Sequence, residues 1–216
     1  VTPRKGYKSV PWLFGKEIEI PDEWENTLII NSGLKVLDGD RGNEYPKESD
    51  FSDIGYCLFL STKNVTRTGF SFLECQFISK EKDQKLRKGC ISIGDIIITT
   101  RGTVGNIAYF DHSIPYEKIR INSGMAILQN QTKIISQNYF YHLLKSPVII
   151  RQLKRLQYGS AVPQLTIGTI NQLKLLIPSL PEQQKIANIL SNVDDLIEST
   201  GKVITHSKKV KTGLMQ

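Results

Sequence analysis

The sequence predicts an α+β fold, in which a mixed β-sheet body with small helices is followed by one long C-terminal α-helix. Up to residue 178, short β-branched and apolar runs alternate with turns rich in Gly, Asp and Pro, as is typical of strands joined by loops. From residue 179 the apolar residues repeat at the seven-residue spacing of a helix that packs against another helix. We therefore divide the chain into a body, residues 1–178, and a terminal helix, residues 179–216.

The body contains several segments with the composition of β-strands. Its opening stretch, as far as Gly15, is basic and irregular, and we expect it to be an arm lying on the surface. Residues 38–52 predict a loop. The clearest hairpin is predicted by the run Ile96–Ile98, a glycine-flanked turn and a second apolar run at 106–110. Further strands are expected near Leu28 and at residues 56–60, 124–128 and 173–177.

Two short helices are predicted before the last of these strands. The apolar residues between 139 and 144 have the spacing of one helix face, and Ser146-Pro147 ends this helix and begins the next, which extends to Leu156. The charged stretch 79–89, in contrast, predicts a surface loop.

The terminal helix has a recognisable start and a long apolar stripe. Ser179 and Glu182 have the spacing of a capping box, and Pro181 falls in the first turn, where its missing N–H costs nothing. About 35 helical residues reach roughly 50 Å, which is longer than a small domain. A helix of this length with one apolar stripe needs a second helix to lie against. The residues expected to form that pairing surface are Ile186, Ile189, Val193, Leu196, Val203 and Val210.

The distribution of charge favours a nucleic-acid partner for the body. The chain of 216 residues has a net charge of +7 and an isoelectric point near 9.2. The terminal helix accounts for only +1 of this, so +6 falls on the body. A basic globular body is typical of proteins that bind nucleic acid.

Cysteine usage and hydropathy point to a cytoplasmic protein. Cys57, Cys75 and Cys90 are odd in number and have neither C-x-x-C spacing nor a neighbouring histidine, which argues against a zinc site and a disulfide framework. The sequence shows no signal peptide, and no apolar run approaches 18 residues, so we expect neither secretion nor membrane insertion.

No catalytic or metal-binding constellation is recognisable. His112, His142 and His206 are far apart and fit no ligand pattern, and the sequence has no phosphate-binding loop, dinucleotide fingerprint or nucleophile elbow. We therefore predict that the chain is not an enzyme and that it has neither catalytic residues nor a metal site.

Polar and basic residues at predicted loop tips are the candidates for DNA contact. Arg pairs with guanine, Asn and Gln pair with adenine, and Ser or Thr bind bases or phosphates. Each of these residues alone is equally well explained as a solvated turn former, but together on a basic body they favour DNA. The candidates are Arg41, Lys63, Asn64, Arg67, Thr100, Arg101, Thr103, Asn106, Ser160 and Gln164.

Four segments carry a more specific pattern. They are Ile20–Glu25, Asp38–Gly42 with Tyr45-Pro46, Gly94–Gly105, and Ile177–Ile186 running on to Asp194. With these segments the chain resembles the specificity (S) subunits of type I restriction–modification enzymes. The resemblance implies a target recognition domain whose loops recognise a few base pairs in the major groove, and a helix that pairs antiparallel with a second such helix. It also implies docking of methyltransferase (M) and endonuclease (R) subunits.

The resemblance assigns the cofactors to partner subunits and is compatible with two assemblies. S-adenosylmethionine, ATP and Mg²⁺ would belong to the partner subunits, with no cofactor on this chain. Members of the family usually carry two recognition domains and two helices, whereas this sequence has one of each. It is therefore expected to be either a half-length subunit that forms a homodimer or one half of a longer subunit.

Two other functions are compatible with the sequence. The first is a stand-alone DNA endonuclease of the restriction type with an unrecognised active site, which metal-dependent cleavage by the chain itself would reveal. The second is a coiled-coil adaptor whose basic body binds another protein. Binding to duplex DNA that weakens linearly with the logarithm of salt concentration would favour DNA recognition over this adaptor.

Overall fold

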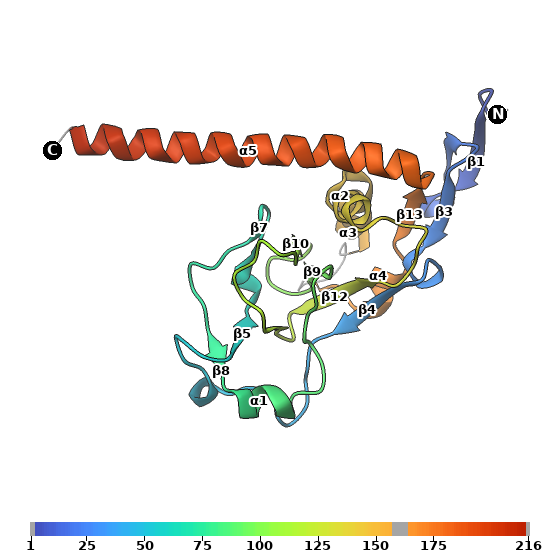
Figure 1. Cartoon of the computed structure of the whole chain (residues 1–216). Helices are drawn as coiled ribbons and strands as arrows, with labels where there is room; N and C mark the ends of the chain where they lie inside the picture. The colour runs from blue at the N-terminus through green and yellow to red at the C-terminus, as the bar shows by residue number, and fades with distance from the viewer. Residues whose placement is uncertain (1–2, 157–163, 215–216) are drawn as a thin grey trace.

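The computed structural model describes residues 3–156 and 164–214. A body of small sheets and short helices carries a single long helix that extends well past it (Figure 1). This confirms the predicted α+β class and the long C-terminal helix.

The main sheet has four antiparallel strands in the order β10-β9-β12-β4. These strands are β4 (Leu34–Asp38), β9 (Ile96–Thr99), β10 (Ile107–Tyr109) and β12 (Met125–Asn130). A smaller mixed sheet contains β5 (Cys57–Leu60), β8 (Phe77–Ile78) and β11 (Ile119–Ile121), with β11 parallel to β5.

Side chains point alternately to the two faces of the main sheet. Each face packs against a different core, so both faces are buried. Ile96 and Ile98 of β9 face a core that includes the apolar residues of α2 and α3. Ile97, between them, faces a second core shared with β5 and β11. All four residues of β9 are consequently buried, and β9 lies between the two cores.

Three two-stranded ladders complete the strands. They are β1 (Tyr7–Pro11) with β2 (Glu17–Pro21), β3 (Glu25–Leu28) with β13 (Lys174–Ile177), and β6 (Val65–Thr66) with β7 (Gly69–Phe70). The β3–β13 ladder connects the body to the start of the long helix. Single 3-10 turns lie at Leu13–Gly15, Ile29–Asn31, Glu48–Asp50 and Thr62–Asn64.

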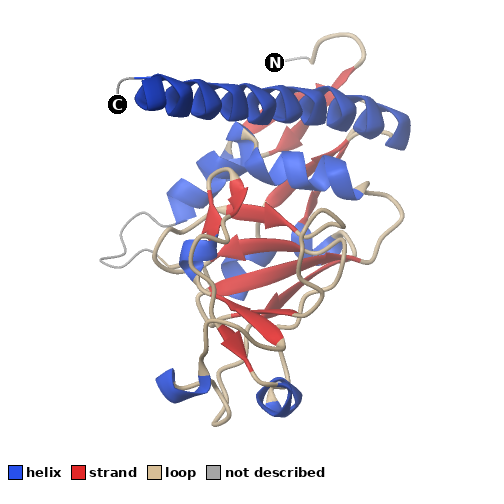
Figure 2. Cartoon of the chain, turned by 60° about the vertical axis from the view of Figure 1, so that its left-hand side comes forward, coloured by secondary structure: helices blue, strands red, loops and turns tan. Residues whose placement is uncertain are grey.

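The helices are α1 (Lys80–Lys85), α2 (Gln137–Lys145), α3 (Pro147–Leu156), α4 (Ile167–Asn171) and α5 (Leu180–Leu214). Hydroxyl groups cap three of them: Ser79, Ser136 and Thr166 each accept a hydrogen bond from the backbone N–H three residues later. Figure 2 shows α2 and α3 lying between the main sheet and α5.

Two local expectations were wrong. The N-terminal arm is the β1–β2 hairpin, in which Pro11 lies at the end of a strand, where a missing N–H is tolerated. The charged stretch 79–89 contains helix α1. Its Asp83 is paired with Arg120, which is only 8% exposed, so this stretch is attached to the body rather than being a free loop.

Candidate nucleic-acid interface

Loops from both larger sheets leave the body at one edge, because the strands before them end side by side. Antiparallel pairing places Asp38, at the end of β4, opposite Ala126 near the start of β12. Parallel pairing places Leu60 opposite Ile121, so that β5 and β11 also end together. The loops that emerge there are residues 39–42, 61–64, 100–106 and 122–124, and we call them the loop edge.

Arg101 is held in the loop edge by its neighbours. The N–H groups of Thr100 and Arg101 donate to the carbonyl oxygen of Gly124, at 2.7 and 3.2 Å. With the amide of Gln164 in the orientation that satisfies both groups, its oxygen accepts from the Arg101 guanidinium at 3.1 and 3.3 Å. The structure therefore brings together Arg101 and Gln164, two candidates that are far apart in the sequence.

Glycines allow the loops to approach so closely. A methyl group on Gly124 would lie 2.9 Å from Cγ2 of Thr62, and one on Gly39 would lie 2.5 Å from the carbonyl oxygen of Asn122. Both distances are shorter than carbon atoms tolerate. Any larger residue would therefore separate the loops that carry the candidate residues.

Asp40 fixes the position of the first loop. Asp40 is 7% exposed, and its carboxylate accepts three backbone N–H bonds, from Gly42 at 2.7 Å, Arg87 at 2.8 Å and Lys88 at 3.2 Å. The bond from Gly42, opposed by partial burial and reinforced by those from Arg87 and Lys88, holds the pKa of Asp40 below its usual value. The charged carboxylate of Asp40 therefore links residues 39–42 to residues 87–88, and we call this link the pin.

The pin places several cations on one surface. Arg41 lies beside it, bonded to Asp38 at 3.0 and 3.1 Å and to the carbonyl oxygen of Ser123 at 3.2 Å. Arg87 and Lys88, both exposed, lie on the other side of Asp40. Buried Arg120 supports this second segment by donating to the carbonyl oxygen of Lys88 at 2.7 Å. Arg87 and Lys88 were not predicted, because their neighbours in the sequence are ordinary surface charges.

Two predicted contact residues are buried in the body, and a third is partly buried. Asn64 is 3% exposed, and its side chain bonds to Ser61 and to the carbonyl oxygens of Ser71 and Glu74. Thr100 is also 3% exposed. Asn106 is half-buried and donates to the carbonyl oxygen of Val65 at 2.9 Å, which ties the loop to the β6–β7 hairpin. The burial and internal bonds of Asn64 and Thr100 correct their assignment to a DNA surface.

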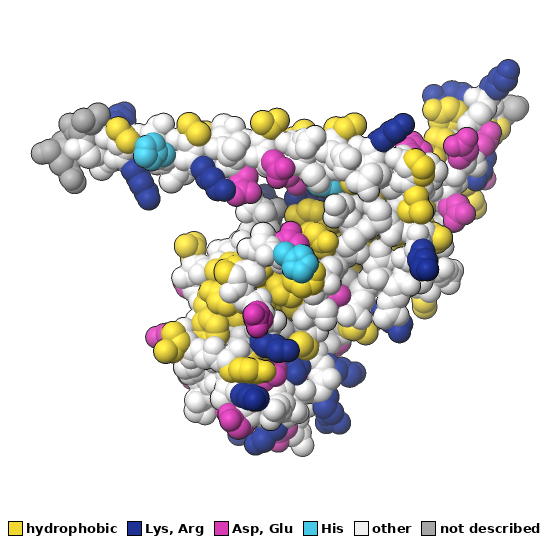
Figure 3. Space-filling model, in the orientation of Figure 1, with side chains coloured by type: hydrophobic (Ala, Val, Ile, Leu, Met, Phe, Trp, Pro, Cys, Tyr) yellow, Lys and Arg dark blue, Asp and Glu magenta, His cyan; other side chains and the backbone are white. Residues whose placement is uncertain are grey.

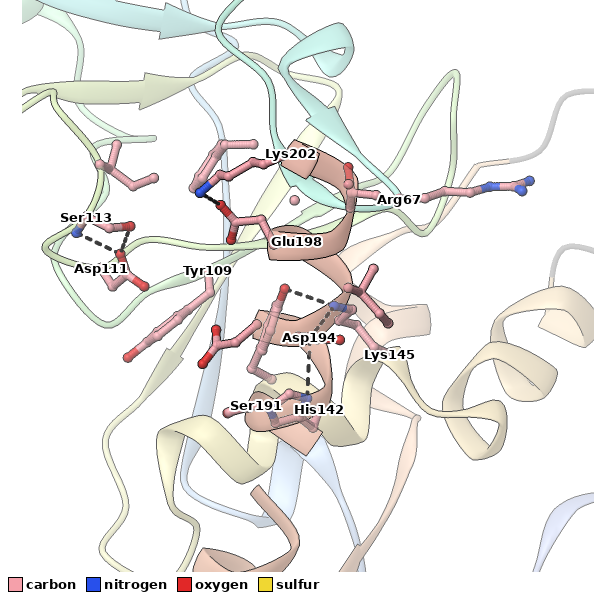
Figure 4. A pocket seen from close by; sticks show the side chains of 18 of the residues that line it. Arg67, Tyr109, Asp111, Ser113, His142, Lys145, Ser191, Asp194, Glu198 and Lys202 are labelled. Atoms are coloured by element: carbon pink, nitrogen blue, oxygen red, sulfur yellow. Dashed lines mark hydrogen bonds and ion pairs between the residues drawn. The ribbon is translucent and has the colours of Figure 1, made fainter. Parts of the chain in front are cut away.

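The remaining candidates lie in different places. Lys63 and Thr103 are exposed on the loop edge, and Lys63 forms an exposed ion pair with Glu74 at 3.3 Å, which holds it only weakly. Arg67 is exposed at the tip of the β6–β7 hairpin, and Figure 4 shows its side chain extending away from the labelled residues of α5. Ser160 lies outside the described residues.

The predicted pairing residues of the terminal helix are largely uncovered. Ile186 packs partly against the main core, unlike the other five. Their exposed fractions are 64% for Ile189, 45% for Val193, 66% for Leu196, 64% for Val203 and 46% for Val210. Figure 3 shows apolar side chains along the side of α5 that faces away from the body. These five residues, with the neighbouring Ile204, form what we call the apolar stripe, whereas Ile197 lines the hollow between α5 and the body.

In residues 3–156 and 164–214, no group of three or more His, Cys, Asp or Glu side chains is arranged to hold a metal ion. None of the helices described is both long and apolar enough to cross a membrane.

Polar and cationic loops lie together at one edge of the body, and the body carries a helix with an uncovered apolar stripe. Residues 23–206 match the family model of the type I restriction modification DNA specificity domain. The chain belongs to this family.

Individual proteins with similar sequences are also type I specificity subunits. The chain is 29% identical over 191 residues to the type I restriction enzyme MjaIX specificity subunit of Methanocaldococcus jannaschii, covering 85% of this chain and 41% of the relative. It is 26% identical over 164 residues to the HindI specificity subunit of Haemophilus influenzae, covering 74% and 35%. The chain thus spans less than half the length of these relatives.

Solved structures share the fold. The HsdS subunit from Thermoanaerobacter tengcongensis has a TM-score of 0.61 at 16% identity, covering 91% of this chain and 48% of that one. The S subunit of a type I restriction–modification system from M. genitalium has a TM-score of 0.55 at 17% identity, covering 83% and 42%.

Proposed function

We propose that this chain recognises one half of a bipartite DNA target for a type I restriction–modification enzyme. The observation that carries the proposal is the convergence of Arg41, Arg101 and Gln164 on one edge of a specificity-domain fold. Loops that carry cations next to an amide suit a duplex, because cations hold phosphates while amides and guanidinium groups pair with base edges.

In this proposal α5 is a spacer between two recognition bodies. The apolar stripe pairs with a second α5, supplied by another copy or by the other half of a longer subunit. Antiparallel pairing places Lys208, Lys209 and Lys211 of one helix near the end of the other that carries Glu182, which is favourable for opposite charges. The length of the paired helices then sets the number of unrecognised base pairs between the half-sites.

Catalysis in this proposal belongs to partner subunits. An M subunit would bring S-adenosylmethionine, and an R subunit would bring ATP and Mg²⁺. This chain would select the sequence on which they act and would place them there. The neutral and charged side chains of the loop edge need no cofactor for this role.

The direct test is to combine the full chain with its M subunit and to map methylated adenines on DNA. We expect methylation at one two-part sequence, and none when either component is omitted. Methyl transfer by the purified chain alone with S-adenosylmethionine would contradict the proposal, as would cleavage by the chain alone with Mg²⁺, which would favour the endonuclease. Binding of the chain to another protein, with no affinity for DNA and no dependence on salt concentration, would favour the adaptor.

A further inference from the structure

Polar contacts attach the long helix to the body: Nε1 of Trp24 donates to Glu182 at 3.0 Å, and two further points of contact lie beyond it along α5. The first is Gln183, which is completely buried. Its Nε2 donates to the carbonyl oxygens of Ile134 at 2.8 Å and Pro178 at 2.9 Å, and its Oε1 accepts from the N–H of Ser136 at 2.8 Å. The bonds to Ile134 and Ser136 hold the first turn of α5 against the loop that precedes α2, and the bond to Pro178 closes the turn that leads into α5.

The second point is a cluster where α5 crosses α2 (Figure 4). Lys145 donates to Asp194 at 3.1 Å and to the hydroxyl of Tyr141 at 3.1 Å, and its ammonium lies 4.7 Å from the centre of the Tyr141 ring. His142, with a side chain 7% exposed, lies with Nε2 3.0 Å from Oγ of Ser191. Lys145, Asp194, His142 and Ser191 are the residues that we call the polar clamp.

Apolar packing does not extend to this crossing. Within the described residues, Ala187 is the last α5 residue in the main core, and residues 192–213 are all exposed. Burial of apolar surface is non-directional, whereas hydrogen bonds and ion pairs depend on distance and angle. The polar clamp therefore fixes the direction of α5 together with the packing of its first two turns.

The consequence of a small rotation is large, because the free part of the helix is long. Twenty residues beyond Asp194 extend about 30 Å. A tilt of about 6° at the clamp moves the far end by about 3 Å, which is close to the 3.4 Å rise of one base pair. An interaction that is weak in energy can thus decide where a second recognition body meets DNA.

We propose that the polar clamp is a positioning device, which sets the direction of α5 and thereby the spacer length that the enzyme accepts between two half-sites. The inference rests on the proposed function. It concerns the geometry between half-sites and assigns no base contact to the clamp, so its residues act through α5 on the second body.

The experiment uses the full chain with its M subunit and duplexes that carry the mapped half-sites with spacers one base pair shorter, equal or longer. In Asp194→Asn the ion pair with Lys145 is lost, and Asp195→Asn removes a neighbouring carboxylate outside the clamp as the matched control. We expect the preference for the natural spacer to fall about 1.5- to fivefold in Asp194→Asn, the factor that such an ion pair is worth. The bases required in each half-site should not change, and the Asp195→Asn profile should match the wild type.

A charge reversal separates positioning from general damage. Lys145→Asp alone should broaden the spacer profile, and adding Asp194→Lys should restore part of the preference. Identical profiles for wild type, Asp194→Asn and Lys145→Asp would overturn the clamp while leaving the proposed function intact. A wild-type complex that methylates no two-part sequence would instead overturn the proposed function. Loss of the required bases in Asp194→Asn would show general damage and would also count against the clamp.

Discussion

The most specific prediction for a single residue concerns DNA binding by Arg101. Its side chain is exposed, and both its backbone and its side chain are held in the loop edge by hydrogen bonds. A guanidinium there either clamps a phosphate or pairs with guanine. We favour the phosphate, because the resemblance places Arg101 in a segment shared by subunits that recognise different sequences. Arg101→Ala should then weaken binding to cognate and scrambled duplexes equally, with the salt slope falling by about one.

A salt series on both duplexes distinguishes the two roles of Arg101. If it pairs with a base, the cognate duplex alone should lose about 1–3 kcal/mol of binding free energy, and one position should become less selective. Unchanged affinity for both duplexes would mean that the loop edge is not the DNA surface. Gln164→Ala is a second test variant, because it removes the hydrogen bonds to the Arg101 guanidinium without removing the charge of Arg101.

Asp40 offers a test of the pin. Asp40→Asn replaces an acceptor by an amide that turns a donor toward backbone N–H groups, so one bond is lost inside the body. We expect the free energy of unfolding to fall by about 1–3 kcal/mol, and DNA affinity to fall because Arg41 and Arg87 are no longer held together. Urea denaturation and DNA titration measure the two effects.

The matched control for the pin is Asp111→Asn. Asp111 also accepts from the N–H two residues later, that of Ser113 at 2.9 Å, but on a turn outside the loop edge. A similar loss of DNA affinity in both variants would show that the pin has no special role.

At the scale of elements, the α2–α5 crossing should respond to pH through His142. Burial lowers the pKa of His142 from 6.5 and outweighs the attraction of Asp194. The unfolded chain therefore binds a proton at His142 more readily than the folded chain does. The stability that depends on a neutral, buried His142 is present above pH 6.5 and is lost as the pH falls below this value. We expect the free energy of unfolding to decrease between pH 7 and 5.

The assignment to His142 is checked by substitution. In urea denaturation at several pH values, His142→Gln should remove part of this decrease, whereas exposed His112→Gln should retain it. Equal pH profiles for wild type and His142→Gln would place the pH response on other groups.

The sequence predicted elements well where periodicity and turn chemistry agree. Strands β5, β9, β10, β12 and β13 and helices α2, α3 and α5 lie close to the predicted segments. The three-residue strand β11 was missed, because Arg120 interrupts its apolar pattern and bonds inward to Asp83. The loop edge could be predicted only in part, since Asn64 and a true surface residue look alike until burial is known.

For the whole molecule, the apolar stripe predicts self-association of the chain through α5. Leu196 and Val203 are about two-thirds exposed, which is unfavourable for a lone helix in water. Light scattering of the full chain at about tens of micromolar, a range suited to a modest coiled coil, should therefore give twice the monomer mass. A monomer would mean that the stripe pairs within a longer chain.

Substitution tests the stripe better than deletion, because removing residues 182–216 would also remove Gln183 and Ala187 from the core. Leu196→Glu with Val203→Glu should yield folded monomers, with a melting temperature lowered only by the stabilisation that pairing gave. Thr205→Glu, on another side of α5, adds charge in the same region and should leave the dimer intact. Dimers in the first variant would assign association to a different surface.

The position of β9 between two cores has a consequence for how this protein can vary. A change of volume at Ile97 or Ile98 disturbs packing on one side of the strand and shifts its backbone on the other, so both cores resist substitution there. The exposed side chains just beyond, Arg101 and Thr103, contribute to neither core. Within a few residues the chain therefore passes from positions where substitution disturbs two cores to positions where it disturbs neither.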